Sequence, residues 1–392
     1  MADNNKADQK KRLGTGPVKA FFLTLPMLLL TGFMMSGGGA LPKEPIRLIP
    51  LAAAYLFVNG IFFMMIYTGR ISRYRTILFV TYAVCFVMTF VTHLIEVRGS
   101  MVLTQADMVQ GNTPFCHMVI PMVIIPAALT KTIIFPGSML EGFASIGTML
   151  VLWFGASLAL GRGWCSWGCF FGGMDEGFSK IGKKPVIGNI NKKWTYLPFA
   201  ILLVIVLTSA ATLYPTYCMW LCPFKAVTEF EEITSAKILV QTVIFFSLFL
   251  GLVVVMPILT KRRTQCGLFC PMGAMQSLTN KLNVFDLRID KSKCSQCNLC
   301  VKNCPVFALD EESVRKGVTR ITCSRCGKCV EVCPQKAISF HIKGTDVGGN
   351  ERKARMMFIY PAFLLLAIMG SGMIAGAIYR MLLLMTTGSM FK

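Results

Sequence analysis

The sixteen cysteines of this 392-residue chain are the residues best suited to do chemistry. Eight of them form two runs with the same spacing, Cys-x-x-Cys-x-x-Cys-x-x-x-Cys-Pro, at residues 294–305 and 323–334. Two-residue spacers let consecutive thiolates converge on one iron–sulfur cube, and the fourth cysteine of such a run crosses to the other cluster. The predicted ligands are Cys294, Cys297, Cys300 and Cys333 for one [4Fe–4S] cluster, and Cys323, Cys326, Cys329 and Cys304 for a second. Zinc also accepts four thiolates, but paired runs with this spacing favour iron.

Two further cysteine pairs stand where apolar stretches end, at residues 165 and 169 and at residues 266 and 270. A spacing of four places both sulfurs of a pair on one helical face. Together the pairs supply the four thiolates of a third [4Fe–4S] cluster, namely Cys165, Cys169, Cys266 and Cys270. The alternative is that they are reduced core thiols, because free cysteine is often buried.

A third pair with the same spacing, Cys218 and Cys222, is followed by proline. With Cys116, and with Cys85 or His117 as the fourth ligand, it would form an outer cluster and complete a relay across the membrane. Two alternatives stay open. In the first, Cys85 and Cys116 are packing residues, and Cys218 and Cys222 bind no metal. In the second, Cys218 and Cys222 join the third cluster.

The elements that position these cysteines are membrane helices. Hydrophobic residues make up 54% of the chain and charged residues 15%, which is fewer than the quarter expected of a soluble protein. The net charge is +21, but the basic residues cluster between apolar stretches, where membrane topology and anionic lipid explain them better than nucleic acid does. The apolar windows long enough to cross a bilayer are 18–36, 46–68, 76–95, 139–160, 195–214, 238–260 and 356–379.

The basic connections fall on one side of the membrane only if residues 115–135, which are interrupted by proline, do not cross it. This predicts an all-α polytopic domain of seven helices with a re-entrant or interfacial segment. It also predicts an inserted α+β ferredoxin domain with two [4Fe–4S] clusters. We divide the chain into a cytoplasmic tail (1–17), the membrane domain (18–285), the cytoplasmic ferredoxin-like domain (286–350) and a last membrane helix (351–392). The expected location is the cytoplasmic membrane of a bacterium or archaeon.

Other sites have weaker signals. His93 and Glu96 lie three apart on one predicted helix and would accept protons from a quinol, or they form a structural pair. Haem is disfavoured, because the chain has three histidines and no Cys-x-x-Cys-His. The sequence has no phosphate-binding or dinucleotide-binding glycine motif, which disfavours a direct NADH dehydrogenase.

The element Gly-Arg-Gly-Trp-Cys-x-x-x-Cys (161–169), the element Cys-x-x-x-Cys-Pro-x-Gly-Ala (266–274) and the ferredoxin that follows resemble the NapH/NosR/MauN-type membrane polyferredoxins. CcoG-type cytochrome-oxidase assembly proteins share this plan. The resemblance covers about residues 139–340. It implies electron transfer between the quinol pool, or a cytoplasmic donor, and a redox partner. Phe170 departs from the family pattern, which often has proline after the second cysteine.

Three functions are consistent with these features. The first is an electron-transfer subunit of an oxidoreductase complex, which relays electrons between the quinone pool or an outer partner and a cytoplasmic redox partner. The second is a maturation factor that reduces a metal or thiol of another enzyme. The third is a membrane anchor for a catalytic subunit. The direction of flow and the partners are not encoded in any motif, because cluster potentials depend on hydrogen bonds, charge and exposure.

Overall fold

The computed structural model describes residues 14–37, 42, 44–96, 119–132, 138–140, 145–188, 190–228, 233–345 and 351–390, without the side chains of residues 90–96, 119, 121–124, 227 and 228. In this part of the chain seven helical segments are long and apolar enough to cross a membrane, which confirms the predicted number. They are Pro17–Met35, Pro45–Thr68, Ile71–Thr89, Ile146–Trp167, Lys192–Thr212, Ala236–Thr260 and Glu351–Thr387. The chain therefore has the fold of a multi-pass membrane protein.

The elements follow in chain order. The elements that start before residue 200 are α2 (Pro17–Met35), α3 (Pro45–Thr68), α4 (Ile71–Glu96), α6 (Val119–Thr130), α7 (Ile146–Leu160), η1 (Gly161–Gly163), α8 (Trp164–Trp167), α9 (Phe170–Phe178), η2 (Lys192–Tyr196) and α10 (Leu197–Thr212). The later membrane elements are η3 (Tyr217–Leu221), α11 (Lys225–Thr228), α12 (Ala236–Leu248), η4 (Phe249–Val255), α13 (Met256–Thr260), η5 (Gln265–Phe269) and α14 (Pro271–Thr279). The polar insertion and the last helix comprise β1 (Phe285–Ile289), α15 (Leu299–Lys302), α16 (Glu311–Lys316), α17 (Lys328–Val332), β2 (Ile338–Ile342) and α18 (Glu351–Thr387).

Local sequence explains where several helices begin. Pro17 and Pro45 occupy the first turns of α2 and α3, where a missing N–H costs nothing and the fixed φ suits a helix. Ser145 and Ser235 cap α7 and α12, because their hydroxyls accept hydrogen bonds from the free N–H groups of the first turn. Asp310 and Ser313 form a reciprocal capping box on α16.

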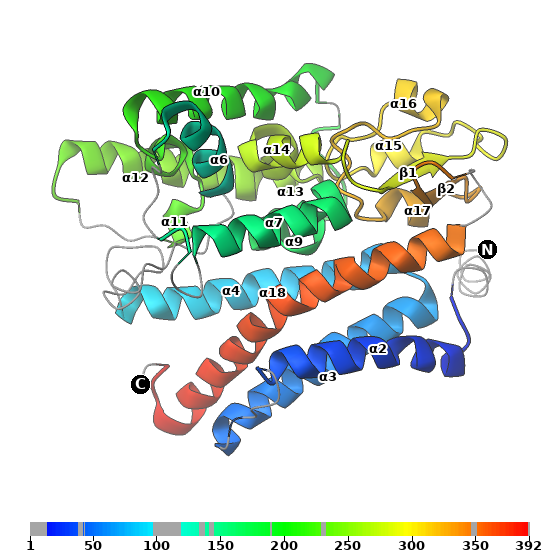
Figure 1. Ribbon diagram of the computed structural model, residues 1–392, viewed down its shortest axis with the longest axis horizontal. Coiled ribbons are helices and arrows are strands. Elements are labelled where there is room, and N and C mark those ends of the chain that lie inside the picture. The colour runs from blue at the N-terminus through cyan, green and yellow to red at the C-terminus, as the bar shows by residue number, and fades with distance from the viewer. Residues whose placement is uncertain are drawn as a thin grey trace.

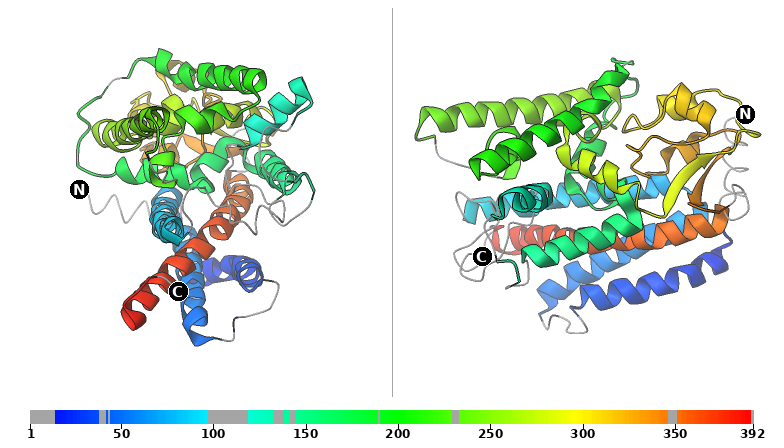
Figure 2. Two further views of the ribbon diagram at one scale, coloured as in Figure 1. Left: turned by 90° about the vertical axis from the view of Figure 1, so that its left-hand side faces the viewer. Right: turned by 45° about the horizontal axis from the view of Figure 1, so that its top comes forward.

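The helices run side by side, and the ferredoxin domain sits at one end of the bundle (Figure 1). Helices α2 and α3 pack together on one side, whereas α10 and α12 lie on the opposite side (Figure 2). Helices α4 and α18 lie between these groups, and α18 contacts α2, α3, α4 and α7. Helix α8 contains Cys165, and helices α9 and α14 begin directly after Cys169 and Cys270; α8 and α9 contact α4, whereas α14 contacts α10.

The long helix α18 joins the two domains. Its 37 residues span about 56 Å, which is longer than a bilayer crossing requires. Its first turns pack against β2, where Phe358 stacks on Phe340 with ring centroids 4.9 Å apart. The sheet is an antiparallel pair with Phe285 opposite Ile342 and Ile289 opposite Ile338. The same helix therefore supports the ferredoxin sheet and crosses the membrane.

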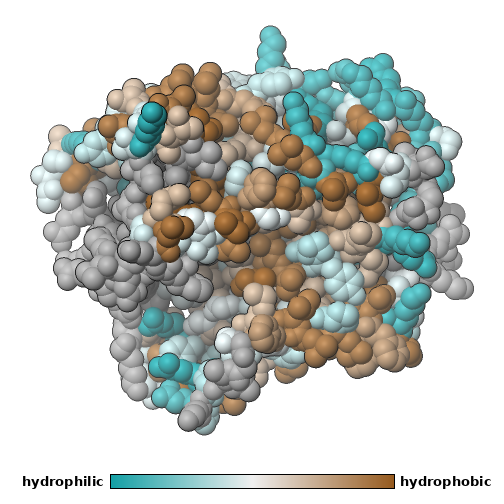
Figure 3. All heavy atoms as spheres, in the orientation of Figure 1, coloured by the Kyte–Doolittle hydropathy of each residue, from teal (hydrophilic) through white to brown (hydrophobic). Residues whose placement is uncertain are grey.

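Within the segment predicted to be re-entrant or interfacial, helix α6 has 12 residues, too few to cross a bilayer, and it packs on α10. The two domains also differ in the hydropathy of their surfaces. Hydrophilic side chains gather over the ferredoxin domain, and hydrophobic ones cover much of the helical part in that view (Figure 3).

Candidate metal centres

The first predicted cluster site is a pocket in the ferredoxin domain. Its lining includes the four predicted sulfurs, which come from two distant parts of the chain, and also Val314 and Ile338. The lining cysteines are Cys294, Cys297, Cys300 and Cys333. The crossing of the fourth cysteine, inferred from spacing, is therefore the arrangement that the backbone adopts.

The two cysteine runs have matching backbone geometry. Asn298 and Gly327, which follow the second cysteine of each run, both have left-handed φ angles of 56° and 77°. Phe307 and Lys336, three residues after the fourth cysteine, repeat this at 56° and 52°. Residues with left-handed φ angles turn the chain tightly, so each cysteine loop curls around its own predicted cluster site.

The second ferredoxin site is more deeply buried. Burial, followed by the neighbouring Cys326 and Cys323 thiols, raises the pKa of Cys304 to about 12. Burial and the same group of thiols raise the pKa of Cys329 well above its ordinary value. These four cysteines are therefore neighbours, as the crossing pattern predicts. The Ala308 N–H donates to Cys304 Sγ at 3.2 Å, and the Ala337 N–H donates to Cys333 Sγ at 3.3 Å in the other site.

The cysteine pairs of the membrane domain meet in a second pocket. It is small and mainly apolar, with Phe171, Tyr217, Phe224 and Met272 in its walls. The cysteines that line it are Cys165, Cys169, Cys266, Cys270 and Cys222. The four thiols predicted to share a third cluster are thus brought together, and one thiol of the pair predicted to lie outside joins them.

The three Cys-x-x-x-Cys pairs are structural repeats. In each, the first cysteine lies in a short helical turn, and the second is extended, with φ and ψ of −81° and 110° at Cys169, −79° and 106° at Cys222, and −65° and 116° at Cys270. Two of the turns, η3 and η5, are π-helical, a form that is frequent at functional sites. The second cysteine precedes a new helix at residues 169 and 270.

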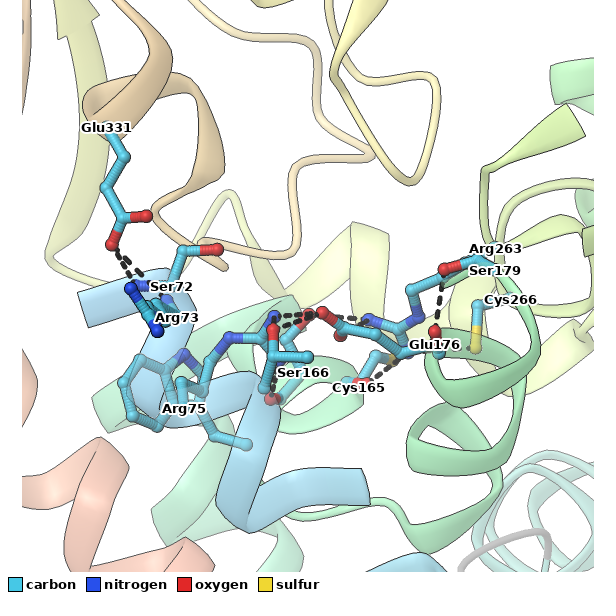
Figure 4. Close-up of polar contacts among 12 residues, drawn as sticks. Ser72, Arg73, Arg75, Cys165, Ser166, Glu176, Ser179, Arg263, Cys266 and Glu331 are labelled. Carbon is cyan, nitrogen blue, oxygen red and sulfur yellow. Dashed lines mark hydrogen bonds and ion pairs between the residues drawn. The ribbon is translucent and has the colours of Figure 1, made fainter. Parts of the chain in front are cut away.

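Arg263 organises the polar side of the membrane pocket (Figure 4). Its guanidinium donates to Cys266 Sγ at 3.1 Å, to the Cys165 carbonyl at 2.6 Å and to Ser166 Oγ at 2.8 Å. The side chain is fully buried. One cation therefore touches both halves of the predicted ligand set, and it hydrogen-bonds a sulfur directly.

A buried carboxylate balances this cation. Glu176 lies 2.6 Å from Arg75 and 3.9 Å from Arg263, and all three side chains are at most 2% exposed. Burial works to raise the pKa of Glu176, but the two guanidiniums outweigh it and hold the pKa far below its ordinary value. Arg75 also donates to the Ser166 carbonyl at 2.9 Å, which fixes α4 to the cysteine loop.

The neighbouring Asp175 accepts a hydrogen bond from the Cys266 N–H at 2.8 Å. Burial raises the pKa of Asp175 to about 7, although Arg263 and this N–H oppose the shift. Burial also raises the pKa of Cys270 to about 12, with a smaller contribution from Cys165. The pocket is therefore shielded from water, as its apolar walls indicate.

The membrane pocket fits an iron–sulfur cluster by its donor set and by an orphaned side chain. Four thiols in two Cys-x-x-x-Cys pairs are suitable ligands for a cubane. Gln265 lies in the pocket wall, and both of its side-chain amide atoms are buried without a hydrogen-bond partner among the described residues. Native proteins seldom leave buried amides unpaired, so Gln265 points to a polar group in this space.

A second set of polar side chains ties the membrane pocket to the ferredoxin domain. Arg162 donates to the Cys266 carbonyl at 2.7 Å and to the Thr322 carbonyl at 2.8 Å. Asn280 donates to the Cys323 carbonyl at 2.9 Å and accepts from the Arg162 N–H at 2.8 Å. One guanidinium thus spans from the loop of the membrane pocket to the residue before Cys323.

Several predicted residues are not brought into these sites by the part of the chain described. Cys218 is half-buried outside the lining of the membrane pocket, and Cys85 is half-buried on α4. Cys116 and His117 fall outside the described residues, as do the side chains of His93 and Glu96. The outer cluster and the quinol site therefore stay predictions, and the position of Cys222 favours the alternative in which it belongs with the membrane pocket.

Sequence reasoning missed the buried polar residues. Its signal was available: Arg162 and Arg263 each precede the first cysteine of a pair by three residues, and Cys218 has Pro215 at that position. Both arginines are buried, and a buried charge is costly unless it is paired, so the shared Arg-x-x-Cys-x-x-x-Cys pattern marks the two pairs that meet.

Two protein-family models match the chain. One is described as a 4Fe-4S dicluster domain and matches residues 293–338. The other is described as a 4Fe-4S binding domain and matches three times, at residues 142–187, 194–237 and 242–290. Each of these three matches contains one Cys-x-x-x-Cys pair, in agreement with the repeated backbone geometry.

Similar proteins include YccM of Escherichia coli K12, named provisionally as an electron transport protein, with 27% identity over 40% of this chain and 45% of YccM. The uncharacterised protein MJ0750 of Methanocaldococcus jannaschii is 27% identical over 45% of this chain and 71% of that protein. The regulatory protein NosR of Pseudomonas aeruginosa is 26% identical over 45% of this chain and 25% of NosR. The match thus spans less than half of YccM and a quarter of NosR. No solved structure matches the chain.

Proposed function

Because this chain is a membrane-bound polyferredoxin of the NosR/NapH type, we propose that it relays electrons through three [4Fe–4S] clusters, between a donor or acceptor in the membrane and a redox partner on the ferredoxin side. The ligands would be the two ferredoxin sets and the set of the membrane pocket. Bound clusters would supply the one-electron chemistry, and the protein supplies binding, orientation and electrostatics.

One contact carries this proposal. Arg162 hydrogen-bonds the Cys266 carbonyl of the membrane pocket and the Thr322 carbonyl beside Cys323 of the ferredoxin domain. Its side chain is 1% exposed. A buried guanidinium held at both ends fixes the distance between the two ligand loops, which is what a relay between them requires.

The order of the sites follows from their burial. The membrane pocket is farthest into the helical domain, and the site of Cys304 and Cys329 is buried beneath the ferredoxin surface. The site of Cys294 and Cys297 is nearest to solvent, since Cys297 is exposed. Electrons would therefore exchange with soluble partners at Cys297 and with a membrane partner at the pocket.

The orientation belongs to the same proposal. The helix ends next to the ferredoxin domain carry Arg70, Lys180, Lys183 and Lys261. Excess lysine and arginine in short connections favours the cytoplasmic side. We therefore assign the ferredoxin domain to the cytoplasm of a bacterium or archaeon.

The test is a redox titration of anaerobically purified protein in nanodiscs, followed by EPR. The expected result is signals from three clusters, with spin coupling between the pair in the ferredoxin domain. After replacement of Cys165 and Cys266 by serine, a quinol analogue should no longer reduce the ferredoxin clusters, whereas dithionite still should. Unchanged reduction by the quinol analogue in that variant would reject the relay.

A further inference from the structure

A wide groove lies between the ferredoxin domain and the adjacent ends of the membrane helices. Its volume is about 1000 Å³, and its walls come from α4, the connection after α9, the end of α13 and the first cysteine run. A neighbouring hollow of about 600 Å³ shares Ser72, Lys180 and Lys328 with it, and extends it along Arg70 and Arg73. The two hollows are therefore adjacent.

The groove is strongly basic. Seven basic side chains and two carboxylates line the larger part. Arg75 and Glu176 neutralise each other in a buried pair, which leaves six cations and Glu311. Among the described residues no carboxylate lies within ion-pair distance of Lys180, Lys183 or Lys302, the last two of which are exposed. The charge is therefore available to a partner.

The groove opens directly onto a candidate redox centre. Cys297 lines both the groove and the first ferredoxin pocket, and it is the one exposed cysteine among the fifteen that the structure describes. Asn298, the next residue, also lines both spaces. Anything that binds in the groove thus contacts the loop that would hold the outermost cluster.

We infer that this groove docks a soluble one-electron carrier protein with an acidic face. The inference rests on the proposed function, because docking leads to electron exchange only if the pocket at Cys297 holds a cluster. In each encounter one electron leaves the reduced centre and enters the oxidised one, and no bond forms or breaks. A basic surface around an exposed centre raises the rate of encounter with acidic partners and excludes basic ones.

A protein fits this space better than an anionic lipid does. Polar side chains predominate on the ferredoxin wall, with Cys297, Asn298, Lys302 and Asn303 beside Val301 and Pro305, which favours a polar protein surface over acyl chains. Arg262, on the opposite wall, is engaged by the ring of Phe307 at 4.9 Å and by the carbonyl of Lys302. Lys183 and Lys302 also line the groove and are exposed, so a protein surface would meet them.

The experiment compares the full-length protein in zwitterionic phosphatidylcholine nanodiscs with two triple variants. K180E/K183E/K302E reverses three charges of the groove. K193E/K281E/K353E makes the same change in net charge at positions outside the groove lining. The probes are an acidic flavodoxin and, as its opposite, the basic cytochrome c. Binding is measured by thermophoresis and electron exchange by stopped flow, over a range of salt concentrations.

In the groove variant, the affinity for flavodoxin and the second-order rate of electron exchange with it should fall at least about tenfold. The affinity for cytochrome c should rise. In the control variant, the affinity and the rate for flavodoxin should change less than about twofold. Salt should weaken flavodoxin binding to the parent and to the control, but much less to the groove variant.

Equal losses in both variants, or no loss in the groove variant, would overturn the inference. So would loss of phosphatidylglycerol binding in native mass spectrometry with flavodoxin binding intact, because the groove would then serve a lipid. Charge-dependent binding by protein that contains no iron would support the docking surface and reject the proposed function, so the two failures are distinguishable.

Discussion

The ferredoxin sites and the membrane pocket place cysteines at similar spacing in very different surroundings. In the ferredoxin domain the sulfurs accept hydrogen bonds from the backbone N–H groups of Ala308 and Ala337, and Cys297 reaches solvent. In the membrane pocket a buried guanidinium, Arg263, touches the Cys266 sulfur, and Glu176 balances it. The difference shows that a negative centre away from water needs fixed counter-charges, because burying unpaired charge is costly.

The largest expected effect breaks this charge balance. E176Q leaves Arg75 and Arg263 buried without their carboxylate, so the free energy of unfolding should fall by about 3–5 kcal/mol. Denaturation in mixed micelles, followed by tryptophan fluorescence, measures this. The matched change E312Q removes an exposed carboxylate of the ferredoxin domain and should leave the unfolding curve in place. Equal effects of the two variants would mean that the buried network has no special role.

The next effect separates the two environments by potential. R263K keeps the charge but loses the planar fork that reaches Cys266 Sγ, the Cys165 carbonyl and Ser166. Loss of a charge-assisted hydrogen bond worth about 1.5–3 kcal/mol should lower the potential of the pocket cluster only. The neighbour variant R262K, which donates no hydrogen bond to a sulfur in the described part of the chain, should leave the potential of the pocket cluster unchanged.

Potentiometric titration monitored by EPR reads this out. A shift confined to one of three signals in R263K supports the comparison. A shift of the ferredoxin signals, or identical titrations of R263K and R262K, would show that the pocket potential is not set by this side chain.

These residues also show how far the sequence could lead. Cysteine spacing predicted both ferredoxin sets, because a short loop leaves three sulfurs few ways to converge. The apolar windows place the pairs 165/169 and 266/270 at the same end of the bundle, and this predicted that the two pairs meet. The positions of Arg75 and Glu176 are 101 residues apart in sequence, and no local pattern pairs them. Cys222 was placed on the far side, because helix counting does not reveal that η3 reaches back to the pocket.

A smaller effect is expected at the boundary between the two regions. Asn280 accepts from the Arg162 N–H and from Arg325, and donates to the Ile321 and Cys323 carbonyls. N280A should therefore lower the local stability of the ferredoxin domain by about 1–3 kcal/mol. Hydrogen exchange of residues 286–345 should accelerate while that of α4 does not. N303A, an exposed asparagine of the same domain, serves as the control, and matching exchange in both variants would argue against the clamp.

The smallest effect tests the exposed part of that boundary. Lys192 lies 2.6 Å from Asp310 and 3.4 Å from Glu312. Burial works to raise the pKa of Asp310, but the hydrogen bonds from Lys192 and Ser313 outweigh it and lower the pKa. A lowered pKa of Asp310 stabilises the folded state at pH values above the ordinary pKa of 3.8. This stability is lost as the pH falls through the lowered pKa of the folded state.

K192Q should therefore shift the unfolding midpoint slightly at neutral pH and less at pH 3. The shift should vanish in about 0.5 M salt, because exposed pairs are screened. Unfolding midpoints at the two pH values measure it. A shift of undiminished size in acid or in salt would mean that Lys192 acts through packing instead of charge.

The most direct test of the account is a count of iron in the membrane pocket. Mössbauer spectroscopy with iron analysis should find about four iron atoms fewer per chain in C165S/C266S than in the parent, with the two ferredoxin clusters intact. C85S, a half-buried cysteine outside the three sites, should keep the full complement. Equal iron in C165S/C266S and the parent would contradict the claim that these thiols hold a cluster in the membrane.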